Sequence, residues 1–157
     1  MSEITVRFAN VNDVPLIYSF IQKKSEFDRE IGAFSGKLKT SEEKIRKTLF
    51  SKKFAYVLFA STIEREIGFA LYCFRYSSFA GQPNIWLDDL YVNENMRSQG
   101  AGTILMTRLV KIAQENDCTH IAWTADKRNT RGLNFYHQLG AKIIKQEDNR
   151  CFFIWTL

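Results

Sequence analysis

The stretch that most constrains the fold is IWLDDLYV, residues 85–92, followed closely by RSQGAGTILM, residues 97–106. A β-rich apolar run gives way to two glycines and then to apolar residues at helical spacing, among them Ile104, Leu105 and Leu109. This pattern requires a strand that passes into a helix through a short glycine-containing loop. Because the free amides of a helix start attract anions, the segment predicts either a plain turn or a phosphate-binding loop.

The spacing of the glycines excludes two familiar phosphate loops. A dinucleotide fingerprint G-x-G-x-x-G that starts at Gly100 needs a third glycine at position 105, which is leucine. Residues 32–38, GAFSGKL, have one residue too few between the glycines for a P-loop, and a leucine stands where Ser or Thr must bind magnesium. What remains is R-x-x-G-x-G, formed by Arg97, Gly100 and Gly102. On spacing alone, a pyrophosphate seat and an ordinary helix start both stay open.

The rest of the chain alternates between strand and helix patterns. Strands are expected at ITVRFA, FAYVLFAS, EIGFALYCFRY, IWLDDLYV, THIAWTA, KIIK and CFFIWTL, and helices after Asn10 or Asn12, over Ser41 to Phe50 behind a capping box of Thr40 and Glu43, after the glycine loop to near Asp117, and over TRGLNFYHQLG. The order is β-α-α-β-β-β-α-β-α-β-β. Its first half suggests antiparallel hairpins and its second half requires a parallel pair. We therefore predict one α/β (α+β) domain over residues 1–157, with a mixed sheet of about seven strands flanked by about four helices.

Charge is unevenly distributed along the 157 residues, whose net charge is +5. Residues 54–93 hold two basic and four acidic side chains, a balance of −2, whereas residues 94–157 hold nine basic and six acidic ones, a balance of +3. This arrangement suits an anionic ligand at the glycine loop and a cationic ligand beside it. No basic stripe is interleaved with aromatic side chains in one element, so no nucleic-acid partner is expected.

Apolar runs and cysteines indicate the compartment. No apolar run approaches the ~20 residues of a membrane span, and MSEITVRF lacks the layout of a secretory signal. Cys73, Cys118 and Cys151 are odd in number and lack the close spacing of metal ligands. Neither a disulfide framework nor a metal site is expected, and we predict a cytoplasmic protein without a membrane partner.

The glycine loop gains meaning from two later residues. Asn129 and Tyr136 lie seven residues apart on an expected helix, and together with the loop they resemble the GNAT superfamily of N-acetyltransferases. There the motif R/Q-x-x-G-x-G/A holds the pyrophosphate of acetyl-coenzyme A. RFANVNDVPLIYSFI, EIGFALYCFRYSSFAGQPNIWLDDLYV and NTRGLNFYHQLGA look like the diamine (spermidine/spermine) acetyltransferase branch and its bacterial relatives. The resemblance covers the whole chain and implies the GNAT fold, acetyl-coenzyme A as co-substrate and a homodimer.

The resemblance also implies which residues bind the donor. In the GNAT fold the strand before the loop splays and opens a slot for the pantetheine arm, and the loop holds the pyrophosphate. Asn129 matches a position that hydrogen-bonds the arm, although it is also a suitable helix cap. The expected cofactor-binding residues are Leu90, Tyr91, Val92, Arg97, Ser98, Gln99, Gly100, Ala101, Gly102, Thr103 and Asn129, with Lys127, Arg128 and Arg131 helping to neutralise the phosphates.

Two residues are expected to carry the chemistry. By its match to the family motif, Tyr136 is the general acid that protonates the sulfur of coenzyme A, since a phenol of pKa about 10 is protonated at neutral pH. Asp88 stands where the branch has a glutamate that accepts the amine proton, and its shorter side chain favours a water relay. Asp89 would face the other side of a regular strand unless a bulge re-aims one of the two. Without the resemblance, Tyr136 would be a core or edge tyrosine of an amphipathic helix, and the two aspartates one solvated and one structural carboxylate.

The acceptor side carries acidic residues. Phe27 and Asp28 match an aromatic-acid pair of the branch, and Asp28 with both central aspartates forms an acidic mouth for a cationic amine. The expected substrate-binding residues are Phe27, Asp28, Asp88, Asp89 and Asp148. Where the branch has an acid-Gly-Trp segment, this chain has Asp148 to Arg150, and an arginine there repels a polycation unless it turns outward or pairs with Asp148.

These residues predict an N-acetyltransferase that moves an acetyl group from acetyl-coenzyme A to a primary amine in a ternary complex. The expected acceptor is a small cationic molecule, namely a diamine, a polyamine or a lysine-like compound. A protein N-terminus or lysine is the alternative acceptor. A non-catalytic module that binds acyl-coenzyme A is the alternative function, which Tyr136 and the acid at position 88 argue against.

Overall fold

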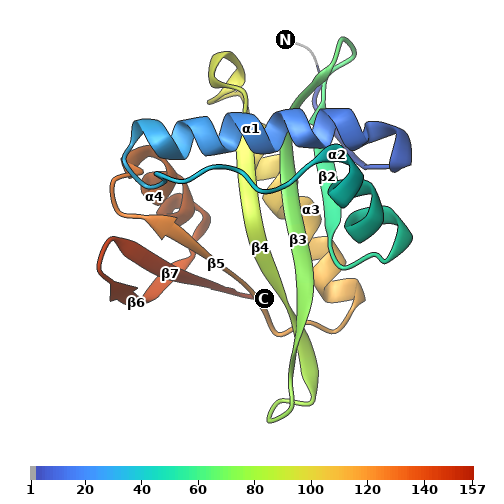
Figure 1. Ribbon diagram of the computed structural model, residues 1–157. Helices are drawn as coiled ribbons and strands as arrows, with labels where there is room; N and C mark the ends of the chain where they lie inside the picture. The colour runs from blue at the N-terminus through green and yellow to red at the C-terminus, as the bar shows by residue number, and fades with distance from the viewer. Residues whose placement is uncertain (1–2) are drawn as a thin grey trace.

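The strand and helix patterns come together as one mixed sheet with helices on both faces (Figure 1). The computed structural model describes residues 3–157. Its strands are β1 (Thr5–Phe8), β2 (Tyr56–Ser61), β3 (Glu66–Ser77), β4 (Gln82–Val92), β5 (His120–Asp126), β6 (Lys142–Glu147) and β7 (Arg150–Thr156). Its α-helices are α1 (Val14–Glu30), α2 (Glu42–Ile45), α3 (Ala101–Glu115) and α4 (Thr130–Leu139), with the short 3₁₀ helices η1 (Val11–Asp13) and η3 (Glu94–Met96) and the π-helix η2 (Arg46–Ser51). The predicted element order and fold class are confirmed. None of the described helices is long and apolar enough to cross a bilayer.

The sheet has the strand order β1-β2-β3-β4-β5-β7-β6. The pair β4 and β5 is parallel, and the other neighbouring pairs in the described chain are antiparallel. Alternation along β2 sends Leu58 and Ala60 into the core beneath α3, whereas Val57 and Phe59 pack with α1. In Figure 1, α1 crosses in front of β3 and β4, and α3 lies behind the same strands.

The second helix differs from the prediction at its start and in its form. The cap is Ser41, whose hydroxyl accepts a hydrogen bond from the Lys44 amide (3.2 Å), so the expected capping box of Thr40 and Glu43 is wrong. After one α-helical turn the chain widens into the π-helix η2. The Thr48 hydroxyl donates to the Lys44 carbonyl (2.7 Å) at this point, and such side-chain bonds compete with the backbone ladder.

Two irregularities of β4 determine the site. β4 pairs with β5 through two residue pairs, Ile85 with Ile121 and Trp86 with Ala122, and beyond them the two strands diverge. On its other side β4 stays paired with β3, but Leu71 lies opposite Asp89 while Tyr72 lies opposite Leu87. Asp88 is therefore the additional residue of a β-bulge, and bulges re-aim side chains and bend the strand locally.

Helix α1 is held on the sheet by an aromatic cluster around Phe20. This side chain is 1% exposed, and its ring centroid lies 5.3 Å from that of Phe69 and 5.8 Å from that of Phe59. It also meets Tyr91 of β4 edge-on at 6.4 Å. The cluster thus fixes α1 over the part of β4 that is no longer paired with β5.

We predict that F20A lowers the free energy of unfolding by about 3–5 kcal/mol, because it leaves a cavity in a packed aromatic cluster. Urea denaturation followed by circular dichroism measures the loss. The matched control is F54A, which removes the same atoms from a side chain that is 71% exposed and should change stability by less than about 0.5 kcal/mol. Equal effects of the two variants would contradict the packing described here.

Candidate active site

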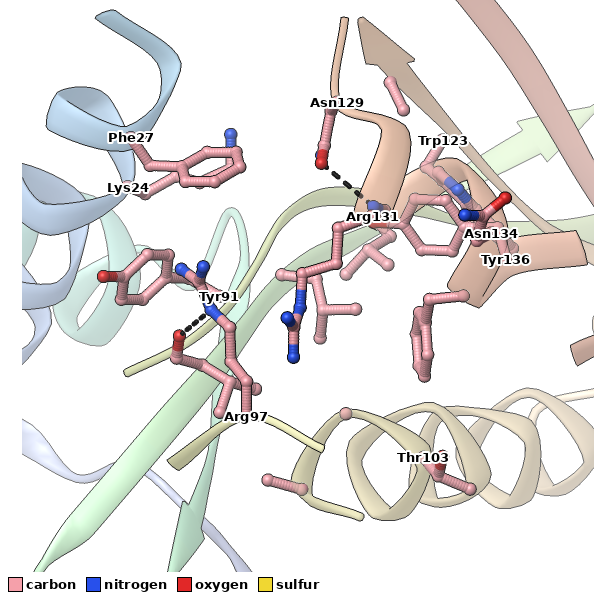
Figure 2. Close-up of a pocket in the computed structure, with 18 of the residues that line it drawn as sticks. Lys24, Phe27, Tyr91, Arg97, Thr103, Trp123, Asn129, Arg131, Asn134 and Tyr136 are labelled. Atoms are coloured by element: carbon pink, nitrogen blue, oxygen red, sulfur yellow. Dashed lines mark hydrogen bonds between the residues drawn. The ribbon is translucent and has the colours of Figure 1, made fainter. Parts of the chain in front are cut away.

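The gap between β4 and β5 opens into a pocket of about 620 Å³. Its walls come from α1, β4, the loop before α3, β5 and α4 (Figure 2). Segments that are far apart in the sequence therefore meet around one space. The described residues that line it include Lys24, Phe27, Asp28, Leu87, Asp88, Leu90, Tyr91, Val92, Arg97, Ser98, Gly100, Ala101, Gly102, Thr103, Trp123, Asp126, Asn129, Arg131, Phe135 and Tyr136.

One end of the pocket is the start of α3. Gly100 precedes the helix with φ of +93°, a left-handed conformation that glycine adopts without strain. The first hydrogen bond of the helix is donated by the Ile104 amide to the Gly100 carbonyl (3.0 Å). The amides of Ala101, Gly102 and Thr103 precede it and have no such intrahelical acceptor. These donors and the helix dipole make this end of the pocket attractive to an anion.

Side chains around the loop add to this end. Arg131 of α4 lines the pocket and donates to the Ser98 hydroxyl (2.7 Å), which fixes a guanidinium beside the helix start. Arg128 instead forms a two-pronged ion pair with Asp126 at 2.8 Å, and Lys127 lies outside the pocket. Of the three basic residues expected to neutralise phosphates, Arg131 is thus the one that lines the described pocket.

Arg97 holds the parted end of β4 in place. Its Nε donates to the Val92 carbonyl (3.0 Å), and its guanidinium lies 5.1 Å from the ring centre of Phe27 and 5.3 Å from that of Tyr91. Such cation–π contacts are favourable when the cation is partly desolvated. Figure 2 shows the Arg97 guanidinium beside the Tyr91 ring, with its hydrogen bond to the strand dashed. Arg97 therefore links the glycine loop to β4 and to α1, which form two walls of the pocket.

The other end of the pocket is acidic. Asp28 of α1 and Asp88 of the bulge both line it, and Lys24 Nζ contacts Asp28 Oδ2 at 2.5 Å. Asp89 lies on the α1 side of β4, since its strand partner Leu71 packs with the α1 cluster. Burial is the main cause that raises the pKa of Asp89 to about 6. The negative charges of Asp88 and Asp28 also raise this pKa, and the positive charge of Lys24 lowers it.

Tyr136 lines the same pocket from α4 and is 8% exposed. Its ring packs against Trp123 at 5.0 Å, Phe153 at 5.2 Å and Phe135 at 5.5 Å between ring centroids. Burial raises the pKa of the phenol above its ordinary value, and the negative charges of Asp89 and Asp28 raise it further. The phenol is therefore protonated at neutral pH and can donate a proton or a hydrogen bond.

The structure brings together most of the residues singled out from the sequence. Of the expected cofactor-binding and catalytic residues, all line the pocket except Gln99. Phe27, Asp28 and Asp88 line it as well, whereas Asp89 and Asp148 do not. Asp148 is exposed in the turn between β6 and β7, with φ of +53°, and Arg150 at the start of β7 helps to lower the pKa of Asp126.

Asn129 has a structural role that the sequence had left open. Its Oδ1 accepts a hydrogen bond from the Gly132 amide (2.9 Å), so Asn129 caps α4. The side chain nevertheless lines the pocket, as Figure 2 shows. A hydrogen bond from Asn129 to the donor stays a prediction.

Sequence reasoning missed Lys24, which lines the acidic end. The signal was present, since Lys24 and Asp28 are four residues apart and such pairs meet on one helix face. Trp123 and Phe135 also line the pocket and were missed, because the sequence does not show which aromatic residues of β5 and α4 face each other. Within residues 3–157 no group of three or more His, Cys, Asp or Glu side chains could hold a metal ion.

Comparisons with known proteins agree with this fold. Residues 24–141 match the model of the "Acetyltransferase (GNAT) family". Thialysine N-epsilon-acetyltransferase of Bos taurus is 27% identical, with 97% of this chain and 92% of the relative covered. Human spermidine/spermine N(1)-acetyltransferase-like protein 1 is 24% identical over 94% of this chain, but the match covers 22% of that longer protein. The crystal structure of PaiA N-acetyltransferase from Thermoplasma acidophilum, in complex with coenzyme A, superimposes with a TM-score of 0.82 at 17% identity and covers 99% of both chains.

The coupling between the two adjacent carboxylates can be tested directly. We predict that D88N lowers the pKa of Asp89 from about 6 toward its ordinary value, because a negative charge that opposes ionisation is removed. Carbon-13 NMR of the side-chain carboxyl, followed against pH, measures this pKa. D117N, at the far end of α3, should leave the pKa unchanged. A pKa of Asp89 that is the same in D88N and wild type would show that Asp88 does not contribute and that burial and Asp28 raise the pKa.

Proposed function

The chain belongs to the Acetyltransferase (GNAT) family, and from this membership we propose that it transfers the acetyl group of acetyl-coenzyme A directly to a primary amine of a small cationic substrate in a ternary complex. The observation that carries the proposal is that one pocket combines an anion-binding end with an acidic end. The donor is an anion with a long neutral arm, and the acceptor is a cation. Each end of the pocket matches one of them in charge.

The donor fits the helix start and the free edge of β4. The unpartnered amides at the start of α3, with Arg131 beside them, suit the pyrophosphate. From Leu87 to Val92 the edge of β4 that faces β5 has no strand partner, so its backbone groups can pair with the amides of a pantetheine arm. Gly100 leaves open space, since an added Cβ would meet nothing within 4 Å. Ser98 to Thr103 would therefore hold the phosphates and Leu90 to Val92 the arm.

The acceptor amine must lose a proton before it attacks. A free alkyl ammonium has a pKa near ~10.4, so at neutral pH a base has to take its proton. Asp88 lines the pocket at the bulge, and we assign it this role through a bridging water. The amine nitrogen then bonds to the thioester carbon and loses a second proton, the bond between that carbon and sulfur breaks to give an amide and a thiolate, and the released proton restores the phenol that protonates the thiolate.

The departing thiolate needs a proton, and we assign its donation to Tyr136. The phenol lines the pocket, is protonated at neutral pH, and lies near enough to Asp89 and Asp28 for their charges to raise its pKa. A rise in phenol pKa weakens the acid, but a thiolate in the same buried surroundings also becomes a stronger base. Proton transfer between the two groups therefore stays favourable.

Similar proteins support a small amine as the acceptor. The relatives named above include acetyltransferases for thialysine, a lysine-like compound, and a spermidine/spermine acetyltransferase-like protein. Asp28 and Asp88 at the acidic end suit the ammonium group common to lysine-like compounds, diamines and polyamines. The same charge would also suit a protein lysine or N-terminus, which makes a peptide acceptor one outcome of the test below.

We further propose that the enzyme acts in the cytoplasm and as a homodimer. Cys73, Cys118 and Cys151 are free thiols, which suits a reducing compartment. Tyr76 and Phe79, at the end of the hairpin of β3 and β4, are exposed aromatic side chains that a second subunit could cover.

The test of the activity is release of coenzyme A thiol from acetyl-coenzyme A in the presence of different acceptors. The panel contains diamines, polyamines, lysine analogues, aminoglycosides and a lysine-containing peptide. We expect turnover with a small cationic amine and slower turnover with the peptide. Tight binding of acetyl-coenzyme A without turnover of any acceptor would favour a binding module instead.

For Tyr136 we predict that Y136F lowers kcat by at least about a hundredfold, because a positioned general acid contributes that much or more. Binding of acetyl-coenzyme A, measured by calorimetry, should change little because the ring remains. Y76F is the matched control, since Tyr76 is 71% exposed on the hairpin. Turnover of Y136F within about twofold of wild type would overturn the assigned role.

A further inference from the structure

The acidic end of the pocket already contains an ammonium group that belongs to the protein. Lys24 extends from α1 into the pocket, as Figure 2 shows, and its Nζ contacts Asp28 Oδ2 at 2.5 Å. The two side chains are 23% and 27% exposed, so the pair is partly shielded from water. The position that the proposed function gives to a substrate amine is thus partly held by a lysine.

The charge of Lys24 reaches the neighbouring aspartates. It lowers the pKa of Asp89, whereas burial, Asp88 and Asp28 raise it. Asp28, Asp88 and Lys24 line the acidic end and give it a net charge of −1, and Asp89, which lies beside the pocket, brings the total to −2 when it is ionised. Arg97 and Arg131 also line the described pocket, but Arg131 contacts the glycine loop, and Arg97 is bonded to the end of β4 with its guanidinium on the Phe27 ring, so neither is ion-paired with a carboxylate of the acidic end. Lys24 is therefore the cation that an acceptor amine meets.

We propose that Lys24 is a specificity-determining residue that limits the number of positive charges the acceptor can carry. The proposal rests on the proposed function of this pocket. An acceptor with one or two ammonium groups can be neutralised by the carboxylates while Lys24 stays paired with Asp28. A tri- or tetra-amine must either displace Lys24 or place an ammonium beside it.

Either course weakens binding of a polycation. Displacing Lys24 breaks a partly buried ion pair, and keeping it sets like charges a few ångströms apart. A repulsive group of this kind discriminates between similar ligands, because specificity depends on the difference between their binding free energies. An acceptor that carries a carboxylate as well as its amines, as an amino acid does, could instead use Lys24 as a partner.

The chain offers a close control in the preceding residue. Lys23 is exposed, its Nζ donates to the Asn93 side chain at 3.3 Å, and it lies 5.1 Å from the ring centre of Phe20. It does not line the pocket. Removing the charge of Lys23 changes the total charge of the protein as much as removing that of Lys24, but not the charge of the pocket.

The experiment compares wild type, K24Q, K24R and K23Q with four acceptors of one to four amines: butylamine, 1,4-diaminobutane, spermidine and spermine. Thiol release gives kcat/KM for each. In K24Q we expect the ratio of kcat/KM for spermine to that for butylamine to rise about tenfold, because one repulsive charge is gone. K24R keeps the charge, and K23Q keeps the pocket, so both should retain the wild-type ratio.

Binding separates this inference from the proposed function. Calorimetry with each amine, in the presence of coenzyme A, measures affinity without turnover. If no amine is acetylated but K24Q binds spermine about tenfold more tightly than K24R does, the proposed function fails and the role of Lys24 stands. If wild type acetylates amines and the ratio in K24Q is unchanged, the role of Lys24 is overturned. If neither wild type nor K24Q binds any amine, both proposals are overturned.

Discussion

The separation of β4 from β5 is the constraint on which the site depends. Two adjacent strands usually pair along their length because unpaired backbone groups are costly to bury. Here the pairing stops after two residue pairs. The space that opens is lined by the start of α3, by the unpaired edge of β4 and by the aromatic side chains Trp123, Phe135 and Tyr136. The chain tolerates the break because β3 holds β4 on one side and β7 holds β5 on the other. The unused edge of β4 is thereby kept free for a ligand.

Electrostatics divides the space that this separation creates. The start of α3 and Arg131 bring positive potential to one end, and the carboxylates of α1 and the bulge bring negative potential to the other. Arg97 joins the two ends, since it is bonded to β4 and stacked on Phe27 of α1. The glycine-loop end and the acidic end of the pocket therefore share a residue, and a shift in α1 would disturb the contacts of Arg97 beside the glycine loop.

The element order and the loop could be predicted because their signals are local. The periodicity of apolar residues predicts strands and helices, and the missing glycine at position 105 excludes a dinucleotide loop without any tertiary information. The cap of the second helix was misassigned because Thr40 and Ser41 are chemically alike and only the backbone geometry distinguishes them. Lys24 was missed because Asp89, whose pKa it lowers, belongs to β4 and is far from α1 in the sequence. The pKa of Asp89 likewise depends on burial that a sequence does not display.

The bulge at Asp88 has a consequence for how this protein can evolve. Side chains alternate along a strand, so a single inserted or deleted residue turns one whole side of the strand over. Residue 88 is the exception because it is the additional residue of the bulge: without it Leu87 would still lie opposite Tyr72 and Asp89 opposite Leu71, so Ile85 and Leu87 would stay in the core. Its loss would instead remove the bulge and the local bend that the bulge gives β4. Homologues should therefore tolerate a one-residue gap here, whereas a gap elsewhere in β4 would turn its side chains over.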